Sequence, residues 1–277
     1  MQRIDAHQHF WKFDPVRDSW ITNEMSVIKK DFMPQDIYPL LQQNGFTGTV
    51  VVQSDQSEAE NNFQLANAGE NDFINGVVGW VDLQAENVEE KLRYYSQFPK
   101  MKGFRHVLQG EEDRALMLKP EFKNGIGLLR KYNFTYDILI FPDQLKYSAE
   151  LVKEFPDQLF VIDHIAKPNI KDKKIADWKK DVQSIAGFEN VYCKISGMVT
   201  EADLKGWRKE DFNPYIDIVV EAFGTNRIMY GSDWPVCLLA ASYESVLEIA
   251  EEYFSSFTKN EQSNFFGGNA IKFYNLN

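Results

Sequence analysis

Short runs of apolar residues alternate along the chain with longer segments in which apolar residues recur every three or four positions. The short runs are typical of buried strands, and the longer segments are typical of amphipathic helices. The pattern predicts eight strands, at residues 3–10, 46–54, 74–83, 101–108, 135–141, 159–165, 190–197 and 227–235. It predicts helices between and after them, at residues 34–43, 58–69, 88–98, 120–132, 144–155, 176–186, 213–223, 242–254 and 259–273.

Strict alternation of strands and helices favours a parallel sheet, and several of the strands are apolar on both faces, as strands between a core and a helix layer are. Eight such units in one chain predict an α/β fold of the closed (β/α)8 type, a TIM barrel. No linker or change of composition divides the chain, so we expect a single domain over residues 1–277. A doubly wound sheet is the alternative, but no glycine-rich dinucleotide loop follows any strand.

The first predicted strand carries two of the four histidines. Side chains alternate faces along a strand, so Asp5, His7 and His9 are expected on one face. The other face then carries Ile4, Ala6 and Gln8. Two imidazoles side by side can share a metal ion or a substrate, although a polar strand near the N-terminus is an equal alternative for this stretch alone.

In a (β/α)8 barrel, catalytic groups lie at the carboxyl ends of the strands. Chemically active residues stand at these ends in the predicted strands, namely His7, His9, Gln53, Arg105, His106, His164, Lys194 and Asp233. All four histidines therefore fall at the same end of the predicted sheet. This grouping predicts one shared site.

Each of these residues also has a structural interpretation. His164 can be a buried imidazole bonded to a carbonyl, and Asp233 can cap a helix, although the residues after it do not resemble a first helical turn. Alternation allows only one of Arg105 and His106 to point inward. We favour Arg105, which can clamp a carboxylate or a carbonyl oxygen, while a salt bridge at the rim is equally open. Lys194 can simply pair with a carboxylate.

Composition narrows the class of protein. The 277 residues are 44% hydrophobic and 26% charged, as in soluble globular proteins, and the net charge is −11. An acidic chain without a basic patch is not expected to bind nucleic acid or a membrane. No apolar run is as long as a membrane span, no signal peptide is apparent, and Cys193 and Cys237 have no metal-like spacing. We therefore expect a cytoplasmic protein.

Motifs along the whole chain resemble those of the amidohydrolase superfamily, and within it the group of sugar-acid lactonases. They are Asp5-Ala6-His7-Gln8-His9-Phe10-Trp11, Val78-Gly79-Trp80-Val81-Asp82-Leu83, Gly103-Phe104-Arg105-His106, Asp163-His164-Ile165-Ala166-Lys167-Pro168, Lys194-Ile195-Ser196-Gly197, Tyr230-Gly231-Ser232-Asp233-Trp234-Pro235 and Gly268-Asn269-Ala270. Single motifs of this length are weak, but their order over the whole chain is specific.

The resemblance implies that His7, His9, His164 and Asp233 hold divalent metal and that Asp233 moves a proton of the attacking water. The chain departs from the two-metal pattern of the superfamily, because strand four offers no bridging lysine or acid and strand five has no histidine. The resemblance therefore implies one divalent metal, zinc in the first place, or none.

The expected reaction is hydrolysis of a sugar-acid lactone, such as L-fucono- or L-rhamnono-lactone, with Asp233 as the general base. His164 and Arg105 are expected to act at the carbonyl oxygen, as they must if no metal binds. The expected substrate-binding residues are Trp11, Gln53, Trp80, His106, Lys194 and Trp234. A decarboxylase or amidase on the same barrel, or a sugar-binding protein without activity, are the alternatives. Whether the chain forms a homodimer is left open.

Overall fold

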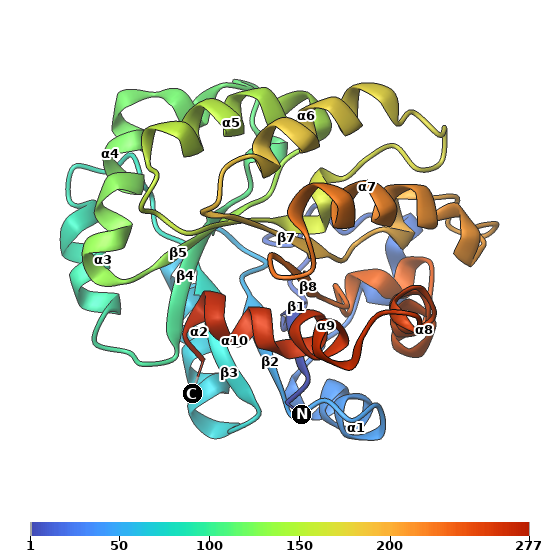
Figure 1. The fold of residues 1–277 in the computed structure, drawn as a ribbon. Helices are drawn as coiled ribbons and strands as arrows, with labels where there is room; N and C mark the ends of the chain where they lie inside the picture. The colour runs from blue at the N-terminus through green and yellow to red at the C-terminus, as the bar shows by residue number, and fades with distance from the viewer. Residues whose placement is uncertain (1, 277) are drawn as a thin grey trace.

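The computed structural model describes residues 2–276, and eight parallel strands form its centre (Figure 1). Each strand pairs with its successor in the chain, in the order β1 to β8. The strands are β1 (Ile4–Gln8), β2 (Gly48–Val52), β3 (Ile74–Gly79), β4 (Met101–His106), β5 (Thr135–Ile138), β6 (Phe160–Ile162), β7 (Val191–Ile195) and β8 (Ile228–Tyr230).

The helices lie around these strands and follow them in the chain. They are α1 (Pro34–Gln43), α2 (Glu58–Glu70), α3 (Val88–Tyr95), α4 (Pro120–Leu129), α5 (Leu145–Glu154), α6 (Ala176–Ala186), α7 (Asn213–Phe223), α8 (Tyr243–Phe254), α9 (Lys259–Ser263) and α10 (Asn269–Tyr274). Within residues 2–276, no helix combines the length and the apolar character needed to cross a membrane.

The last strand returns to the first and nearly closes the sheet. The His9 N–H donates to the Trp234 carbonyl over 2.7 Å, and the Asp233 N–H donates to the His7 carbonyl over 2.9 Å. The predicted (β/α)8 barrel in one domain is therefore confirmed. The closure also places the ends of β1 and β8, with their polar residues, side by side.

Two apolar clusters hold the barrel together. The larger packs the outward faces of the strands against the helices. The smaller fills the interior with Ile4, Ala6, Val50, Val52 and residues of β3, β6, β7 and β8. Residues of α10, among them Phe273 and Tyr274, belong to this inner cluster and close the amino-terminal end of the barrel. The carboxyl ends of the strands are left for the site.

The prediction that Asp5 shares a face with His7 and His9 is wrong. Asp5 pairs with Thr49 and Gln8 with Val51, so β1 holds one residue more than β2 in this interval. This bulge breaks the alternation of faces. Ile4 and Ala6 pack inside the barrel, His7 follows them inward, and the Asp5 carboxylate instead accepts hydrogen bonds from the backbone N–H groups of His7 and Ser232.

Several elements are also shorter than the pattern predicts. Regular pairing ends at Ile138, Ile162 and Tyr230, so the residues expected at the ends of β6 and β8 lie in the loops that follow. The expected closing helix is broken into α9 and α10 by a π-helical turn at Asn264–Gly268. Gly267 lies in this turn with a non-helical backbone, and glycine is needed there because a Cβ atom would lie 2.3 Å from the Gln2 carbonyl oxygen.

The buried carboxyl of Asp5 makes a prediction about pH and stability. Burial raises the pKa of Asp5 from 3.8 to about 6, although hydrogen bonds from Ser232 and His7 oppose the shift. Between about pH 4 and 6 the folded chain keeps a proton that the unfolded chain releases, so stability from this group falls as pH rises. Asp5→Asn has no carboxyl to ionise, so it does not lose this stability. The free energy of unfolding of the variant minus that of wild type should therefore rise by roughly 3 kcal/mol from pH 4 to 7.

Urea unfolding of both proteins at several pH values measures this difference. Asp72→Asn changes an exposed carboxyl by the same substitution and should show a flat difference. If the difference in free energy of unfolding between Asp5→Asn and wild type were also independent of pH, the Asp5 carboxyl would ionise in the folded chain as readily as in the unfolded chain.

Candidate active site

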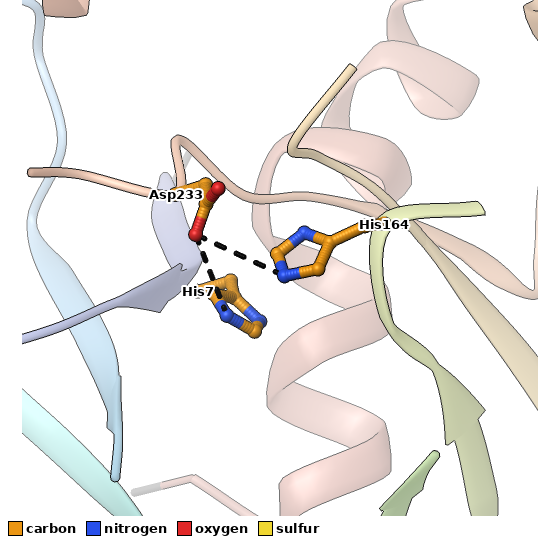
Figure 2. Close-up of side chains that lie close together, drawn as sticks. All are labelled: His7, His164 and Asp233. Atoms are coloured by element: carbon orange, nitrogen blue, oxygen red, sulfur yellow. Dashed lines mark ion pairs between the residues drawn. The ribbon is translucent and has the colours of Figure 1, made fainter. Parts of the chain in front are cut away.

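Four side-chain atoms converge at the carboxyl end of the barrel. One oxygen of Asp233, Oδ1, lies 3.3 Å from His9 Nε2, 3.8 Å from His164 Nε2 and 3.9 Å from His7 Nε2. His7 Nε2 and His9 Nε2 are 3.2 Å apart. Figure 2 shows His7 and His164 directed at the Asp233 carboxylate. The three elements that supply this cluster are far apart in sequence, and all of its side chains are buried.

Each imidazole is held by its other ring nitrogen. His9 Nδ1 lies 2.8 Å from the Val52 carbonyl oxygen, and His164 Nδ1 lies 2.9 Å from Ser196 Oγ. His7 Nδ1 lies 3.3 Å from Asp163 Oδ1. A partner at Nδ1 sets the orientation of the ring and leaves the Nε2 lone pair directed at the centre.

Burial determines the protonation of the cluster. It lowers the pKa of His7 and of His164 well below the ordinary value, so both rings are neutral near pH 7. For Asp233 burial raises the pKa, but His164 and His9 outweigh it and the pKa of this carboxyl lies below its usual value. The site therefore combines neutral imidazoles with an ionised carboxylate.

The backbone that carries His164 is strained. Four consecutive residues, His164 to Lys167, have positive φ angles between 48° and 59°. Left-handed backbone costs about 1–2 kcal/mol for a residue with a side chain, and more for a branched one such as Ile165. The Trp178 indole N–H donates to the Ile165 carbonyl over 2.8 Å and holds the segment. Such strain is typical of a backbone that must place two side chains, here His164 and Lys167, in one cavity.

Arg105 points into the barrel, and its guanidinium is fixed on two sides. Nη1 lies 3.0 Å from Asp163 Oδ2 and 3.4 Å from His7 Nε2, and Nη2 donates to the Gln53 carbonyl over 2.5 Å. Gln53 thus contacts Arg105 rather than open space. His106 points away, as alternation predicts. Its Nδ1 accepts from the Trp80 indole, and its Nε2 lies 2.7 Å from Glu111.

A cavity of about 350 Å³ opens above this cluster. Its wall brings together His9, His164, Arg105 and Asp233, and it includes Trp11 as predicted. Among residues 2–276, the wall does not include His7, Gln53, Trp80, His106, Lys194 or Trp234. Trp234 packs edge-on against Phe10 and Phe32, and Lys194 lies deeper in the barrel.

Several residues that surround the site have no distinctive position in the sequence pattern. Asp163 stands directly before His164, and only His164 was predicted as a site residue. Nothing in the pattern of β5 distinguishes Asp137 from the other strand residues. The cavity wall also includes Arg17, Trp20 and Lys167. Arg17 and Trp20 lie in the long segment between β1 and α1, and connections of this length in a compact domain are usually functional. The Trp11 and Trp20 rings meet edge-to-face with centroids 5.9 Å apart.

The converging atoms fit a divalent metal. His7, His164 and Asp233 each offer one ligand atom, and these atoms lie within 4.8 Å of one another. Neutral imidazoles and a carboxylate are ligands that zinc prefers, and the partner at each Nδ1 supplies the second layer of contacts found around such ions. His9 Nε2 is close enough to His7 and Asp233 to be a fourth ligand.

A (β/α)8 barrel with imidazoles and a carboxylate converging at the strand ends fits the active site of a hydrolase. The family profile described as amidohydrolase matches residues 4–276, and the chain therefore belongs to the amidohydrolases. The L-fucono-1,5-lactonase of Burkholderia multivorans is 36% identical over 285 residues, covering 99% of this chain and 96% of that protein.

Solved structures agree with this assignment. A crystal structure of an amidohydrolase from Burkholderia multivorans with bound zinc superposes with a TM-score of 0.96 at 35% identity, over 100% of both chains. A structure described as a probable 2-pyrone-4,6-dicarboxylic acid hydrolase from Acinetobacter baumannii, with citric acid bound, has a TM-score of 0.79 at 19% identity, over 100% of both chains. At that identity the second likeness shows the fold alone.

The contact between Gly197 and His164 makes a prediction about activity. A Cβ atom at Gly197 would lie 2.4 Å from His164 Nδ1, and Gly197 has a φ of 61°. Gly197→Ala should therefore displace the imidazole and lower kcat/KM by about 10²-fold, with a stability loss of about 1–3 kcal/mol. Steady-state kinetics and urea unfolding measure the two effects.

Gly224→Ala is the matched control. Gly224 has a φ of 66°, and no atom lies within 4 Å of the position a Cβ would take. This variant should lose similar stability and keep its kcat/KM. Equal kcat/KM for both variants would mean that His164 can shift without consequence for the reaction.

Proposed function

We propose that this amidohydrolase opens a neutral sugar lactone of the L-fucono-1,5-lactone type to the free aldonic acid. The observation that carries the proposal is the convergence of three imidazoles, two of them kept neutral by burial, on the ionised Asp233 carboxylate at the base of the cavity. The relative at 36% identity, whose name states this substrate, supports the choice of lactone. A cavity of about 350 Å³ is in the range of small-molecule sites.

In this mechanism Asp233 is the general base. Its carboxylate takes a proton from the attacking water and returns it to the ring oxygen when the ester bond breaks. Arg105 lines the same cavity and donates to the carbonyl oxygen as negative charge develops there; without a metal, His164 donates beside it in the tautomer that carries the proton on Nε2 and accepts from Ser196 at Nδ1. Asp163 and Gln53 keep Arg105 in place, and Trp11 and Trp20 offer aromatic faces to the sugar ring.

We also propose that His7, His9, His164 and Asp233 hold one zinc ion. A divalent ion bound there would supply a Lewis acid for the carbonyl and lower the pKa of water toward about 7. Metal content after purification and activity after treatment with a chelator test this part. Full activity in metal-free protein would leave Arg105 and His164 as the groups that act on the carbonyl.

The charges of the cavity favour a neutral substrate. Its cationic side chains already contact carboxylates: Arg17 contacts Asp18 at 2.8 Å, Arg105 contacts Asp163 at 3.0 Å, and Lys167 contacts Glu201 at 3.5 Å. The wall also carries the carboxylates of Asp55 and Asp233. A dicarboxylate would therefore lose its hydration without gaining a free cation in return.

A panel of lactones, read by acid release, tests the proposal. L-fucono-1,5-lactone and related neutral lactones should be hydrolysed with kcat/KM at least about 10²-fold above that for 2-pyrone-4,6-dicarboxylate. The same panel should include an amide and an aromatic acid, which an amidase or a decarboxylase would use. Turnover of one of these and none of the lactones would overturn the proposed reaction.

A further inference from the structure

A second group of charged side chains lies inside the barrel, below the candidate metal site. Lys194, on β7, extends its ammonium into the interior. Its Nζ lies 2.6 Å from Asp137 Oδ2, 3.0 Å from Asp163 Oδ1 and 3.1 Å from His7 Nδ1. The side chains of these four residues have no exposed surface. The ammonium is therefore enclosed by two carboxylate oxygens and the Nδ1 edge of one imidazole, which come from β5, from the turn after β6 and from β1.

This set of acceptors has the chemistry of a metal site. Two buried carboxylate oxygens, placed around one point, are donors that small divalent cations take, while the Nδ1 edge of His7 faces Asp163. The other oxygen of Asp137, Oδ1, is buried and has no hydrogen-bond partner among the described residues. The Lys194 ammonium donates to Asp137 Oδ2 and lies 3.0 Å from Asp163 Oδ1, so it supplies the positive charge of a bound cation without a metal.

The charges of this group balance only when Lys194 is present. Asp137 and Asp163 are two buried carboxylates, and Arg105 and Lys194 are the two cations beside them. Arg105 contacts Asp163 but makes no ion pair with Asp137 among residues 2–276. Tyr274, on α10, donates to Asp137 Oδ2 over 2.7 Å but brings no charge. Loss of the ammonium would leave a space lined by carboxylates that calls for another cation.

We propose that Asp137 and Asp163 form a second cation site inside the barrel, beside the Nδ1 edge of His7, that the Lys194 ammonium is its permanent occupant, and that Lys194 thereby keeps divalent metals out of it. The site lies below His7, whereas the candidate metal site lies on the Nε2 side of the same ring. The proposal assigns Lys194 to the interior and not to the substrate, and it does not depend on which lactone is hydrolysed.

Two substitutions of Lys194 separate charge from space. Lys194→Ala removes the ammonium and leaves room beside both carboxylates, whereas Lys194→Met removes the same charge but fills the space. The probe is Mn²⁺, measured as bound metal per chain after dialysis, together with the shift in Tm on adding Mn²⁺. Lys194→Ala should bind one Mn²⁺ more per chain than either wild type or Lys194→Met, and its Tm alone should gain a second Mn²⁺-dependent increase.

The double variant Lys194→Ala with Asp137→Asn is the control for the ligand set, and it should lose the additional ion. Lys194→Met lacks the same ammonium beside His7, so any change at the cavity site is common to the Ala and Met variants, and their difference is independent of the proposed function. Equal metal content in the Ala and Met variants, or a second ion in wild type, would overturn the proposal. If Lys194→Ala folds only with Mn²⁺ and the double variant does not share this rescue, the proposal is supported; absence of rescue overturns it.

Discussion

Replacing Asp233 by asparagine should lower kcat for L-fucono-1,5-lactone by about 10²–10⁴-fold, the range found when a general base is removed. An amide has nearly the shape of the carboxylate and can still accept hydrogen bonds, but it cannot take a proton from water. The backbone at Asp233 has a φ of 56°, which asparagine tolerates as well as aspartate, so the fold should be retained.

Steady-state kinetics, Tm and bound zinc should be measured together, because Asp233 is also a candidate ligand. Asp55→Asn is the matched control, since Asp55 lines the same cavity and makes no ion pair with His7, His9 or His164 among the described residues. This control should change KM more than kcat. A kcat for Asp233→Asn within tenfold of wild type, at unchanged zinc content, would remove Asp233 as the base.

Replacing Lys194 by methionine should lower the free energy of unfolding by about 3–5 kcal/mol at pH 7, the usual cost of removing one partner of a buried ion pair. Burial already raises the pKa of Asp137 to about 6 with the Lys194 ammonium beside it. Without that ammonium the carboxyl should keep its proton to still higher pH. The loss of stability should therefore shrink as the pH is lowered toward 5.

Urea unfolding of three variants tests this result. Adding Asp137→Asn to Lys194→Met removes the carboxylate that lost its cation and should restore part of the stability. Lys91→Met removes a lysine whose ion pair with Glu58, at 2.9 Å, lies on the surface, and it should cost less than about 1 kcal/mol. Equal losses for the Lys194 and Lys91 variants would mean that the interior network contributes no more than a surface pair.

The fold class follows from local periodicity in the sequence, whereas the direction of individual side chains does not. Helix and strand periodicity is local, and strict alternation has few stable arrangements, so the eight units were sufficient to predict the barrel. The same reasoning brought His7, His9, His164 and Asp233 to one place, because parallel strands end on the same side of a barrel. These four residues do converge.

Predictions of direction were less successful where regular structure ends. Alternation put Asp5 with His7 and His9, but a bulge in β1 reverses this relation. Trp80, His106 and Trp234 stand near strand ends in the sequence, yet they pack against neighbouring side chains outside the cavity wall that residues 2–276 form. Sequence position within a strand does not say how the chain bends after its last paired residue.

The sequence alone therefore determined the fold class, the end of the barrel that carries the site and the histidines and aspartate that meet there. Only the tertiary structure decided the inward direction of His7, the left-handed segment at His164 and the interior contacts of Lys194 with Asp137 and Asp163. The physical reason is the distance along the chain between the residues that interact. Periodicity records whether a neighbour is apolar or polar, whereas a bulge, a positive φ or a buried ion pair is stabilised by residues far away in the chain, which no local pattern contains.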